Sequence, residues 1–381
     1  MRQIKINFPS RLVFGNGCVN DFIADFDSMA LKNVLIVTTP AVRQYCEKIV
    51  RKLKRRGIGI LVDESTQREP TILDLQHALL SAEQINADGV IGIGGGSVLD
   101  VAKLVAVLYK SSQTIHDIFG IDRVNRKTLY LACLPTTAGT GSEVSPNAIL
   151  RDESDNQKKA VVSRYVVPDA AYVDPLLTLS VPPAITAATG IDALTHCIEA
   201  YANRYAHPLT DGYAIKGIRS IAKNLAHVFE NDQDREAREQ VALGSMCGGL
   251  CLGPVNTAAV HALAYPLGSI FHIAHGMANA LLLPHVMRFN LQTSPQRYAD
   301  IAIALGAEPG RDDVETAEKG VSIVDELNRF LQIPQKLSQM SIEKSDIKSM
   351  AEDAVRIERL LKNNLRHVSF DDAVSIYEQA F

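Results

Sequence analysis

From about residue 33 the chain alternates short apolar runs, rich in β-branched residues, with longer amphipathic stretches. In chain order the segments are VLIVTT, AVRQYCEKIVRKLKRRG, IGILVDES, TILDLQHALLSAEQINA and GVIGIGGG. The short runs lack the polar alternation of a strand with one wet face, so they predict parallel strands that are buried on both faces by the intervening helices. This order of strands and helices predicts an α/β domain.

The pattern of the sequence changes once along the chain. The segment LYLACLPTT (129–137) predicts a further strand, and AILRDESDNQKKAVV (148–162) predicts a hairpin with a polar tip. From Pro182 to the C-terminus nearly every stretch has the apolar period of a helix, and none predicts a strand. A Pro-rich segment separates the part with predicted strands from the part with helical periods alone. We therefore expect an α/β domain over residues 1–180 and an all-helical domain over residues 181–381.

The composition excludes several classes of protein. Of the 381 residues 46% are hydrophobic and 22% are charged, which is typical of a globular chain of about two domains. A net charge of −4 provides no general basic surface for nucleic acid, and no uncharged run is long enough to cross a membrane. Six scattered cysteines form no disulfide framework, and MRQIKINFPS is not a secretory signal, so we expect a cytoplasmic protein.

A glycine-rich turn follows the third of the predicted strands. GVIGIGGGSVLDVAK (89–103) ends its apolar run in Gly94, Gly95 and Gly96 and places Ser97 where a helix can begin. Glycines let a ligand approach the backbone, and the N–H groups at a helix start favour an anion. The turn is therefore a candidate phosphate cradle, and a tight turn without a ligand is the alternative.

A second loop, PTTAGTGSEVS (135–145), is rich in hydroxyl groups. They belong to Thr136, Thr137, Thr140, Ser142 and Ser145. Helix caps and turns account for two such hydroxyls but not for five. Hydroxyls and amides at the carboxyl ends of parallel strands suit a pyrophosphate and a ribose. The two loops together predict a site for a dinucleotide, NAD or NADP.

Histidines are concentrated in a mostly apolar window, residues 261–285, which holds four of the ten in the chain. A buried imidazole without a partner is costly, so His261 and His275 in this window need a reason for their burial. Earlier, GIDALTHCIEAY places Asp192 and His196 four residues apart, on one face of a predicted helix. One carboxylate and three imidazoles could bind Fe²⁺ or Zn²⁺, and local hydrogen bonding is the alternative.

Four motifs, in this order, closely resemble the iron-containing (group III) alcohol dehydrogenase family: GGGSVLDVAK, PTTAGTGSEVS, GIDALTHCIEAY and HALAYPLGSIFHIAHGMANALLLPHVMRFN. The resemblance implies a dehydroquinate synthase-like fold, with a Rossmann-like nucleotide-binding domain followed by an all-α metal-binding domain. It also implies hydride transfer between NAD(P)(H) and a small alcohol, aldehyde or ketone, in a homodimer or larger homo-oligomer.

The resemblance assigns the site residues as well. It implies that the metal ligands are Asp192, His196, His261 and His275. It implies that the cofactor contacts Gly95, Gly96, Ser97 and Asp100 at the pyrophosphate, Thr136, Thr137, Thr140 and Ser142 near the phosphates and ribose, and Asn147 and Lys158 further along.

Two positions depart from the family pattern within the site. Tyr265 stands where many members have a second histidine, so Tyr265 and His272 are our candidates for proton exchange, with simple packing the alternative for Tyr265. Thr39 stands at the cofactor position where NAD-preferring members carry an aspartate. Without that carboxylate a 2′-phosphate is not repelled and Arg43 could attract it, so the choice between NAD and NADP stays open.

A third departure lies near the C-terminus, where NNLRH replaces the family's asparagine-proline-arginine. Lys362 and Arg366, in the same region, are candidate anchors for a substrate carboxylate or simply solvated surface.

Two other classes of function also fit the sequence in part. The dehydroquinate synthase relatives share the two domains and the metal but use the nicotinamide transiently within one turnover, as a lyase or synthase does. A cofactor-binding regulator without turnover would need an empty or inert metal site. PTTAGTGSEVS and the histidine motif HALAYPLG…HG match the alcohol dehydrogenases better than the synthases, and the intact ligand set argues against a regulator.

Overall fold

The computed structural model describes residues 2–66, 69–155 and 157–381, which form two compact units. The α/β unit comprises residues 6–137 and 141–180. The helical unit comprises residues 181–381, the segment Ala138–Thr140 and the N-terminal residues up to Lys5. Part of the hydroxyl-rich loop therefore packs with the helical unit, which no pattern in the sequence indicated.

The larger sheet of the α/β unit has six strands among the described residues, and all neighbouring strands are parallel. Its order is β1 (Arg11–Phe14), β9 (Ala170–Val173), β6 (Tyr130–Pro135), β4 (Gly89–Gly94), β2 (Asn33–Val37) and β3 (Gly59–Asp63). Strands β2, β3, β4 and β6 confirm the apolar runs that were predicted as strands. Strands β1 and β9 were missed because four residues are too few to show a period.

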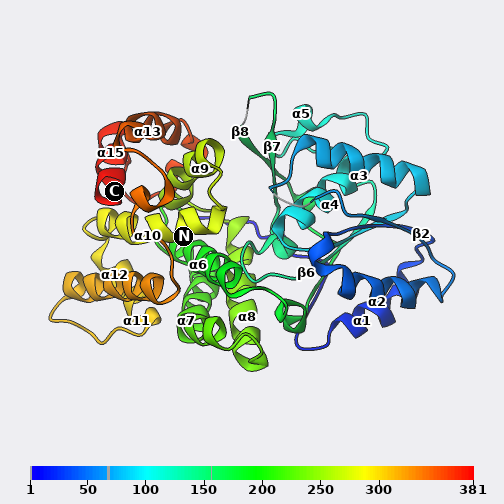
Figure 1. The fold of residues 1–381 in the computed structure, drawn as a ribbon, viewed down its shortest axis with the longest axis horizontal. Helices are drawn as coiled ribbons and strands as arrows, with labels where there is room; N and C mark the ends of the chain where they lie inside the picture. Colours follow the sequence, from blue (N-terminus) through cyan, green and yellow to red (C-terminus); the bar gives the residue numbers. More distant parts are fainter. Residues whose placement is uncertain (1, 67–68, 156) are drawn as a thin grey trace. The chain divides into compact units, whose positions relative to one another are not determined.

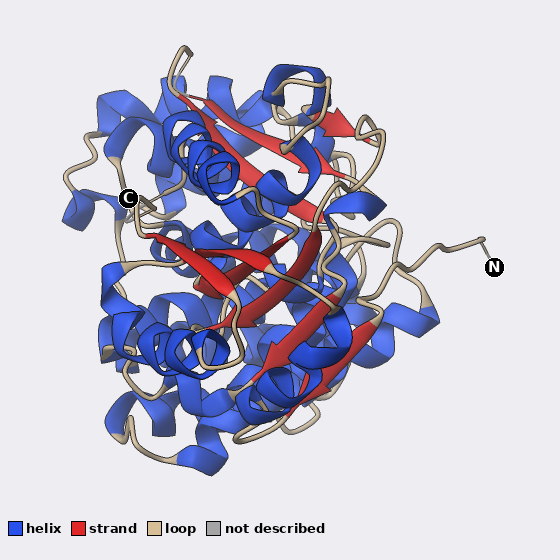
Figure 2. Ribbon diagram, turned by 90° about the vertical axis from the view of Figure 1, so that its right-hand side faces the viewer, coloured by secondary structure: helices blue, strands red, loops and turns tan. Residues whose placement is uncertain are grey.

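Alternate side chains of this sheet enter two separate apolar cores. Leu35 and Val90 pack with α3 and α4, whereas Val34 and Ile91 pack with α1 and α2. The helix bounds are α1 (Val19–Asp25), α2 (Arg43–Lys54), α3 (Ile72–Ile85) and α4 (Gly96–Leu108). Figure 2 shows helices on both sides of the strands. The predicted burial of both faces is therefore confirmed.

The predicted hairpin is also present, as the antiparallel pair β7 (Asn147–Asp152) and β8 (Gln157–Val162). A short strand β5 (Gly120–Ile121) pairs with β8. The buried ammonium of Lys103, on α4, holds the start of β7, because its Nζ donates to the carbonyls of Ser145 at 2.9 Å and Asn147 at 2.7 Å.

The helical unit confirms the prediction that helices without strands follow Pro182. Its main helices are α6 (Pro183–Tyr201), α7 (Pro208–Glu230), α8 (Arg235–Leu252), α9 (Ala259–Phe271), α10 (His275–Leu291), α11 (Pro295–Leu305), α12 (Asp313–Phe330), α13 (Ile347–Val355), α14 (Glu358–Leu361) and α15 (Phe370–Gln379). Residues 182–381 contain no strand beyond the isolated bridge between Asn203 and Asn364. Within the described parts of the chain, no helix combines the length and apolarity that crossing a membrane requires.

Helix α6 is the centre of this unit, and its packing explains the composition of its sequence. Fifteen of its residues are buried, and α7, α8 and α10 pack around it. Such a helix is apolar on nearly all sides, so the polar side chains that it carries must find partners inside the protein.

One buried carboxyl group makes the stability of the α/β unit depend on pH. Glu143 lies in a 3-10 turn, η3 (Ser142–Val144), and is 3% exposed. Burial raises the pKa of Glu143 from 4.5 to about 7, and the nearby Lys103 ammonium opposes the shift only in part. Because the folded-state pKa lies above the unfolded one, its stabilising contribution is complete below pH 4.5 and is lost as the pH rises through 7.

We expect Glu143→Gln to remove this dependence. The melting temperatures of the cofactor-free variant and wild type should differ little near pH 5. By pH 8 the melting temperature of the variant should be higher than that of the wild type. A shift from 4.5 to about 7 corresponds to about 3 kcal/mol. Calorimetry of both proteins across this range measures the difference, and a difference that stays constant with pH would contradict the assignment.

Candidate functional site

Helix α6 presents three polar side chains from one face of an otherwise apolar helix. Asp192, His196 and Glu199 follow one another at four and three residues, and each is at most 5% exposed. The Nε2 atom of His196 lies 3.9 Å from Oδ1 of Asp192. Groups spaced in this way share a face, so the contact follows from the helix itself.

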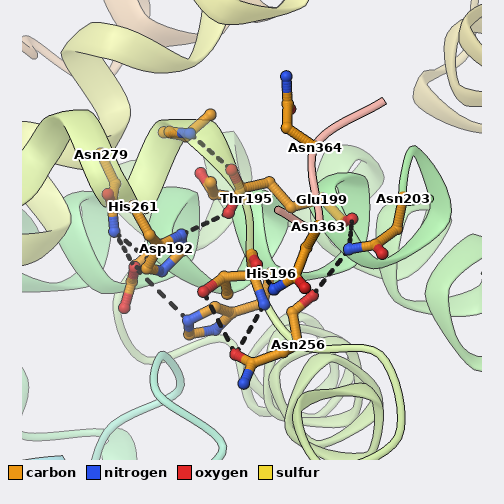
Figure 3. Close-up of polar contacts among 12 residues, drawn as sticks. Asp192, Thr195, His196, Glu199, Asn203, Asn256, His261, Asn279, Asn363 and Asn364 are labelled. Atoms are coloured by element: carbon orange, nitrogen blue, oxygen red, sulfur yellow. Dashed lines mark hydrogen bonds and ion pairs between the residues drawn. The ribbon is translucent and has the colours of Figure 1, made fainter. Parts of the chain in front are cut away.

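Two further histidines reach Asp192 from other helices. Nε2 of His261, on α9, lies 3.6 Å from Oδ1 of Asp192, and Nε2 of His275, the first residue of α10, lies 3.8 Å from it. Among the described residues these three side chains form a group whose ligand atoms all lie within 4.8 Å of one another. Figure 3 shows Asp192 and His261 converging in the interior of the unit.

His196 borders this group of three. Its ring stacks on that of His261, with centroids 4.8 Å apart and planes at 19°. The structure therefore brings together all four residues that the sequence suggested as ligands, with His196 slightly further from the others.

Glu199 fixes the orientation of His261, and the sequence analysis missed it. Its Oε2 lies 2.6 Å from Nδ1 of His261, and its Oε1 accepts the backbone N–H of Val260 at 2.6 Å. With Nδ1 paired to Glu199, Nε2 is the ring nitrogen that faces Asp192 and that a metal would bind, which is the usual arrangement of metal-binding histidines. The spacing of three residues from His196 on a helix was the available signal.

Asn279 supplies the observation that tests this group as a metal site. Its Nδ2 lies 2.6 Å from Oδ1 of Asp192 and 3.2 Å from Nε2 of both His261 and His275. Its Oδ1 is buried without a hydrogen-bond partner. Oδ1 of Asp192 and the two Nε2 atoms thus converge on one point, and the buried carboxylate there calls for positive charge. A carboxylate and imidazole nitrogens suit a divalent transition metal.

Ion pairing has a larger effect than burial on the pKa values of Asp192 and His261. Burial alone would raise the pKa of Asp192, but the surrounding imidazoles outweigh it and hold that pKa well below its usual range. Burial alone would lower the pKa of His261, but Glu199 and Asp192 raise it to about 10. Each buried charge of the group therefore depends on the others.

A glycine permits the approach of α10 to α6. A Cβ on Gly276 would lie 2.3 Å from the carbonyl oxygen of Ala188. No other residue fits without moving one of the helices, and the neighbouring His275 is thereby held within reach of Asp192.

The glycine turn and, apart from Ala138–Thr140, the hydroxyl-rich loop lie together in the α/β unit. Gly95 is the N-cap of α4, directly after β4, and Gly96 and Ser97 open the helix. The N–H of Thr136, after β6, donates to the carbonyl of Gly94 at 3.0 Å. A Cβ on Gly95 would lie 3.3 Å from Oγ1 of Thr137. Both loops thus meet at the carboxyl edge of the sheet, where such sheets bind ligands.

Asp100 and Ser142 bind each other. Ser142 Oγ donates to one carboxylate oxygen of Asp100 at 2.6 Å, and the N–H of Ile149 donates to the other at 3.0 Å. The carboxylate thus joins α4 to the second loop and to β7. Thr140 belongs with the helical unit, and Asn147 begins β7.

Two cationic side chains near the predicted cofactor positions are already paired. Lys158, which is 5% exposed, forms an ion pair with Glu69. Arg43 Nε donates to Glu64 at 3.0 Å, and its guanidinium makes a second bond to the same carboxylate. Thr39 occupies the N-cap position of the short 3-10 turn that precedes Arg43, without a side-chain capping hydrogen bond. Glu64 follows β3, which runs beside β2, so its carboxylate lies near the position where Thr39 lacks one.

The two candidates for proton exchange differ in their surroundings. Tyr265 is 8% exposed, and its ring centroid lies 6.0 Å from that of His275. His272 is exposed and caps α9 with a left-handed backbone, φ 56°. Residues 272–274 are not helical, so His272 does not share a helical face with His275. Its role in proton exchange stays a prediction.

Comparison with known proteins agrees with these two halves of the chain. Residues 9–175 match the family model for iron-containing alcohol dehydrogenase, and residues 186–381 match the C-terminal model of the same family. The chain belongs to the iron-containing alcohol dehydrogenase family.

Similarity to individual members of this family extends over the whole chain. The chain is 38% identical to long-chain-alcohol dehydrogenase 1 of Geobacillus thermodenitrificans, covering 100% of this chain and 98% of that one. The crystal structure of a 1,3-propanediol oxidoreductase superposes with a TM-score of 0.96 at 31% identity, with full coverage of both chains. That of sulfoacetaldehyde reductase from Bifidobacterium kashiwanohense in complex with NAD⁺ gives 0.90 at 26%, covering 100% and 99%. The fold predicted from the family resemblance is confirmed.

We expect Glu199→Gln to weaken metal binding about tenfold to a hundredfold, because an amide orients and polarises His261 less strongly than a carboxylate does. Competition with a chelator, followed by metal analysis, measures the affinity. The exposed Glu236, on α8, provides the control Glu236→Gln, which should bind metal as the wild type does. Equal affinity in the Glu199 and Glu236 variants would show that Glu199 does not act on the metal site.

Proposed function

We propose that this member of the family is a metal-dependent oxidoreductase that interconverts small alcohols with aldehydes or ketones. The observation that carries the proposal is the convergence of Asp192, His261 and His275 within 4.8 Å, with His196 stacked beside them. These four residues would hold Fe²⁺, or Zn²⁺ as the alternative. The metal, when bound, polarises the substrate carbonyl or lowers the pKa of the alcohol.

We further propose the following roles for the residues of the chain. Glu199 holds His261 in the required tautomer, and Asp192 provides the negative charge of the site. Gly95, Gly96 and Ser97 would bind the pyrophosphate of NAD(H) or NADP(H), which carries the hydride. The remaining cofactor contacts would come from Thr39, Asp100, Thr136, Thr137, Thr140, Ser142, Asn147 and Lys158. Tyr265 or His272 would pass the proton.

The dehydrogenase assignment predicts steady oxidation of NADH when a short aldehyde is added to the Fe²⁺- or Zn²⁺-loaded protein. Removal of the metal with a chelator should lower the rate by at least about a hundredfold, because the polarising charge is lost. Adding the metal back should restore the rate. A synthase would show no steady change of nicotinamide absorbance, and full turnover without metal would exclude the proposed site.

The pairing of Arg43 with Glu64 favours NAD(H) over NADP(H). Glu64, which follows β3, neutralises Arg43 and supplies the negative charge that Thr39 lacks. The guanidinium is therefore not available to the 2′-phosphate of NADP(H). We therefore propose NAD(H) as the preferred cofactor.

Glu64→Gln tests this preference because it leaves Arg43 free for a phosphate. The ratio of kcat/KM for NADPH to that for NADH should rise about tenfold, as a charge-assisted bond allows. The double variant Arg43→Ala/Glu64→Gln should lose that gain. An unchanged ratio in Glu64→Gln would mean that the pair does not face the adenosine ribose.

We also propose a cytoplasmic enzyme, consistent with its six free cysteines, and a homodimer or larger homo-oligomer. The domain division proposed for it is residues 1–180 and 181–381. Light scattering of the purified protein determines the number of subunits.

A further inference from the structure

The four proposed ligands are not equally buried. The side chains of Asp192, His196 and His261 are at most 6% exposed, whereas that of His275 is 30% exposed. The ring of Tyr265 is tilted at 59° to that of His275. Tyr265 lies one turn after His261 on α9, so it borders the less buried side of the metal site.

A guanidinium reaches the hydroxyl of this tyrosine. Nη2 of Arg359, on the short helix α14, lies 3.5 Å from the Tyr265 oxygen, a long hydrogen bond. Arg359 is half-buried, and none of the ion pairs among the described residues includes it. A guanidinium has five N–H donors, so most of its donors are available to an acceptor.

Arg359 is held in place by the segment that follows α14. Asn363 Nδ2 donates to the carbonyl of Thr257 at 2.8 Å, just before α9. The side chains of Asn364 and Asn290 exchange hydrogen bonds at 2.8 and 2.9 Å. These asparagines are at most 4% exposed, and Figure 3 shows Asn363 and Asn364 near the site. Asn363 and Asn364, the two asparagines of the NNLRH segment, thus fix the C-terminal end of α14.

Apolar contacts complete this arrangement. Leu360, the neighbour of Arg359, is 1% exposed and forms a small cluster with Tyr265 and Ala262 of α9. Ile357, two residues before Arg359, packs against the same cluster, so the backbone is anchored on both sides of the arginine.

The cationic residues that the sequence suggested as carboxylate anchors lie elsewhere. Lys362 is exposed. The guanidinium of Arg366 is exposed and covers the ring of Phe289 at 4.0 Å, with Asp372 3.6 Å away. Neither contacts the metal group or Tyr265 in any interaction that the structure records, so Arg359 is the cation associated with the site.

We propose that Arg359, together with the Tyr265 hydroxyl, is a specificity subsite for the carboxylate of short aldehyde acids and hydroxy acids. The inference rests on the proposed function, because the aldehyde end of the substrate would be at the metal. A guanidinium binds a carboxylate through paired, charge-assisted hydrogen bonds, and a half-buried position strengthens them relative to water. The positive charge otherwise has no acidic partner in the described residues.

The experiment compares two four-carbon aldehydes that differ in the carboxylate, 4-oxobutanoate and butanal, on the metal-loaded enzyme with NADH. The wild type should have the higher kcat/KM for 4-oxobutanoate. Arg359→Met should lower that value about tenfold or more relative to butanal, mainly through KM, and Arg359→Lys should restore part of it. Lys362→Met, an exposed neighbour, is the matched control and should keep the wild-type preference.

Tyr265→Phe should produce a smaller loss of the same preference, because it removes only the hydroxyl that positions the guanidinium. An aldehyde preference that is identical in wild type and Arg359→Met would overturn the proposal.

Calorimetric binding of succinate separates the subsite from the proposed function. Wild type should bind succinate more tightly than Arg359→Met, whether or not either aldehyde is reduced. Inactivity toward both aldehydes with this binding difference intact would refute the dehydrogenase assignment and support the subsite. Equal succinate binding by the two proteins would overturn the subsite.

Discussion

The packing of the central helices of the helical unit depends on the contacts of one buried carboxylate, that of Asp192. Its Oδ1 lies within 3.9 Å of imidazole nitrogens from α6, α9 and α10, and it accepts a hydrogen bond from Asn279. A charge at this depth is stable only when opposite charge and hydrogen bonds surround it. The three helices must therefore approach closely, and Gly276 permits the approach of α10 to α6.

The site around Asp192 has a buried side and a more exposed side. On the inner side Glu199 clamps His261, so a carboxylate, an imidazole and a second carboxylate form a continuous polar chain inside an apolar core. On the other side His275 is partly exposed and is bordered by Tyr265, which Arg359 contacts. Rigid charge pairing on one side and accessible donors on the other suit a metal that must be held firmly while its substrate changes.

The parts of the fold and site that could be predicted are those with a local signal. The buried strands β2, β4 and β6 show unbroken apolar runs, whereas β1 and β9 are too short to show one. Asp192 and His196 share a helical period, so their proximity was predictable. Glu199 has the same period and was overlooked, because a glutamate on a helix is usually solvated.

Local signals along the chain specify the type and order of the elements, the glycine turn after β4 and the candidate metal-binding residues. These follow from periodicity and from backbone preferences, which act over a few residues. No local signal indicates that Glu64 neutralises Arg43, or that Arg359 rather than Lys362 or Arg366 contacts Tyr265; the folded chain brings these residues together. These pairs depend on how distant segments pack, and packing is settled by the summed burial of many side chains rather than by any local pattern.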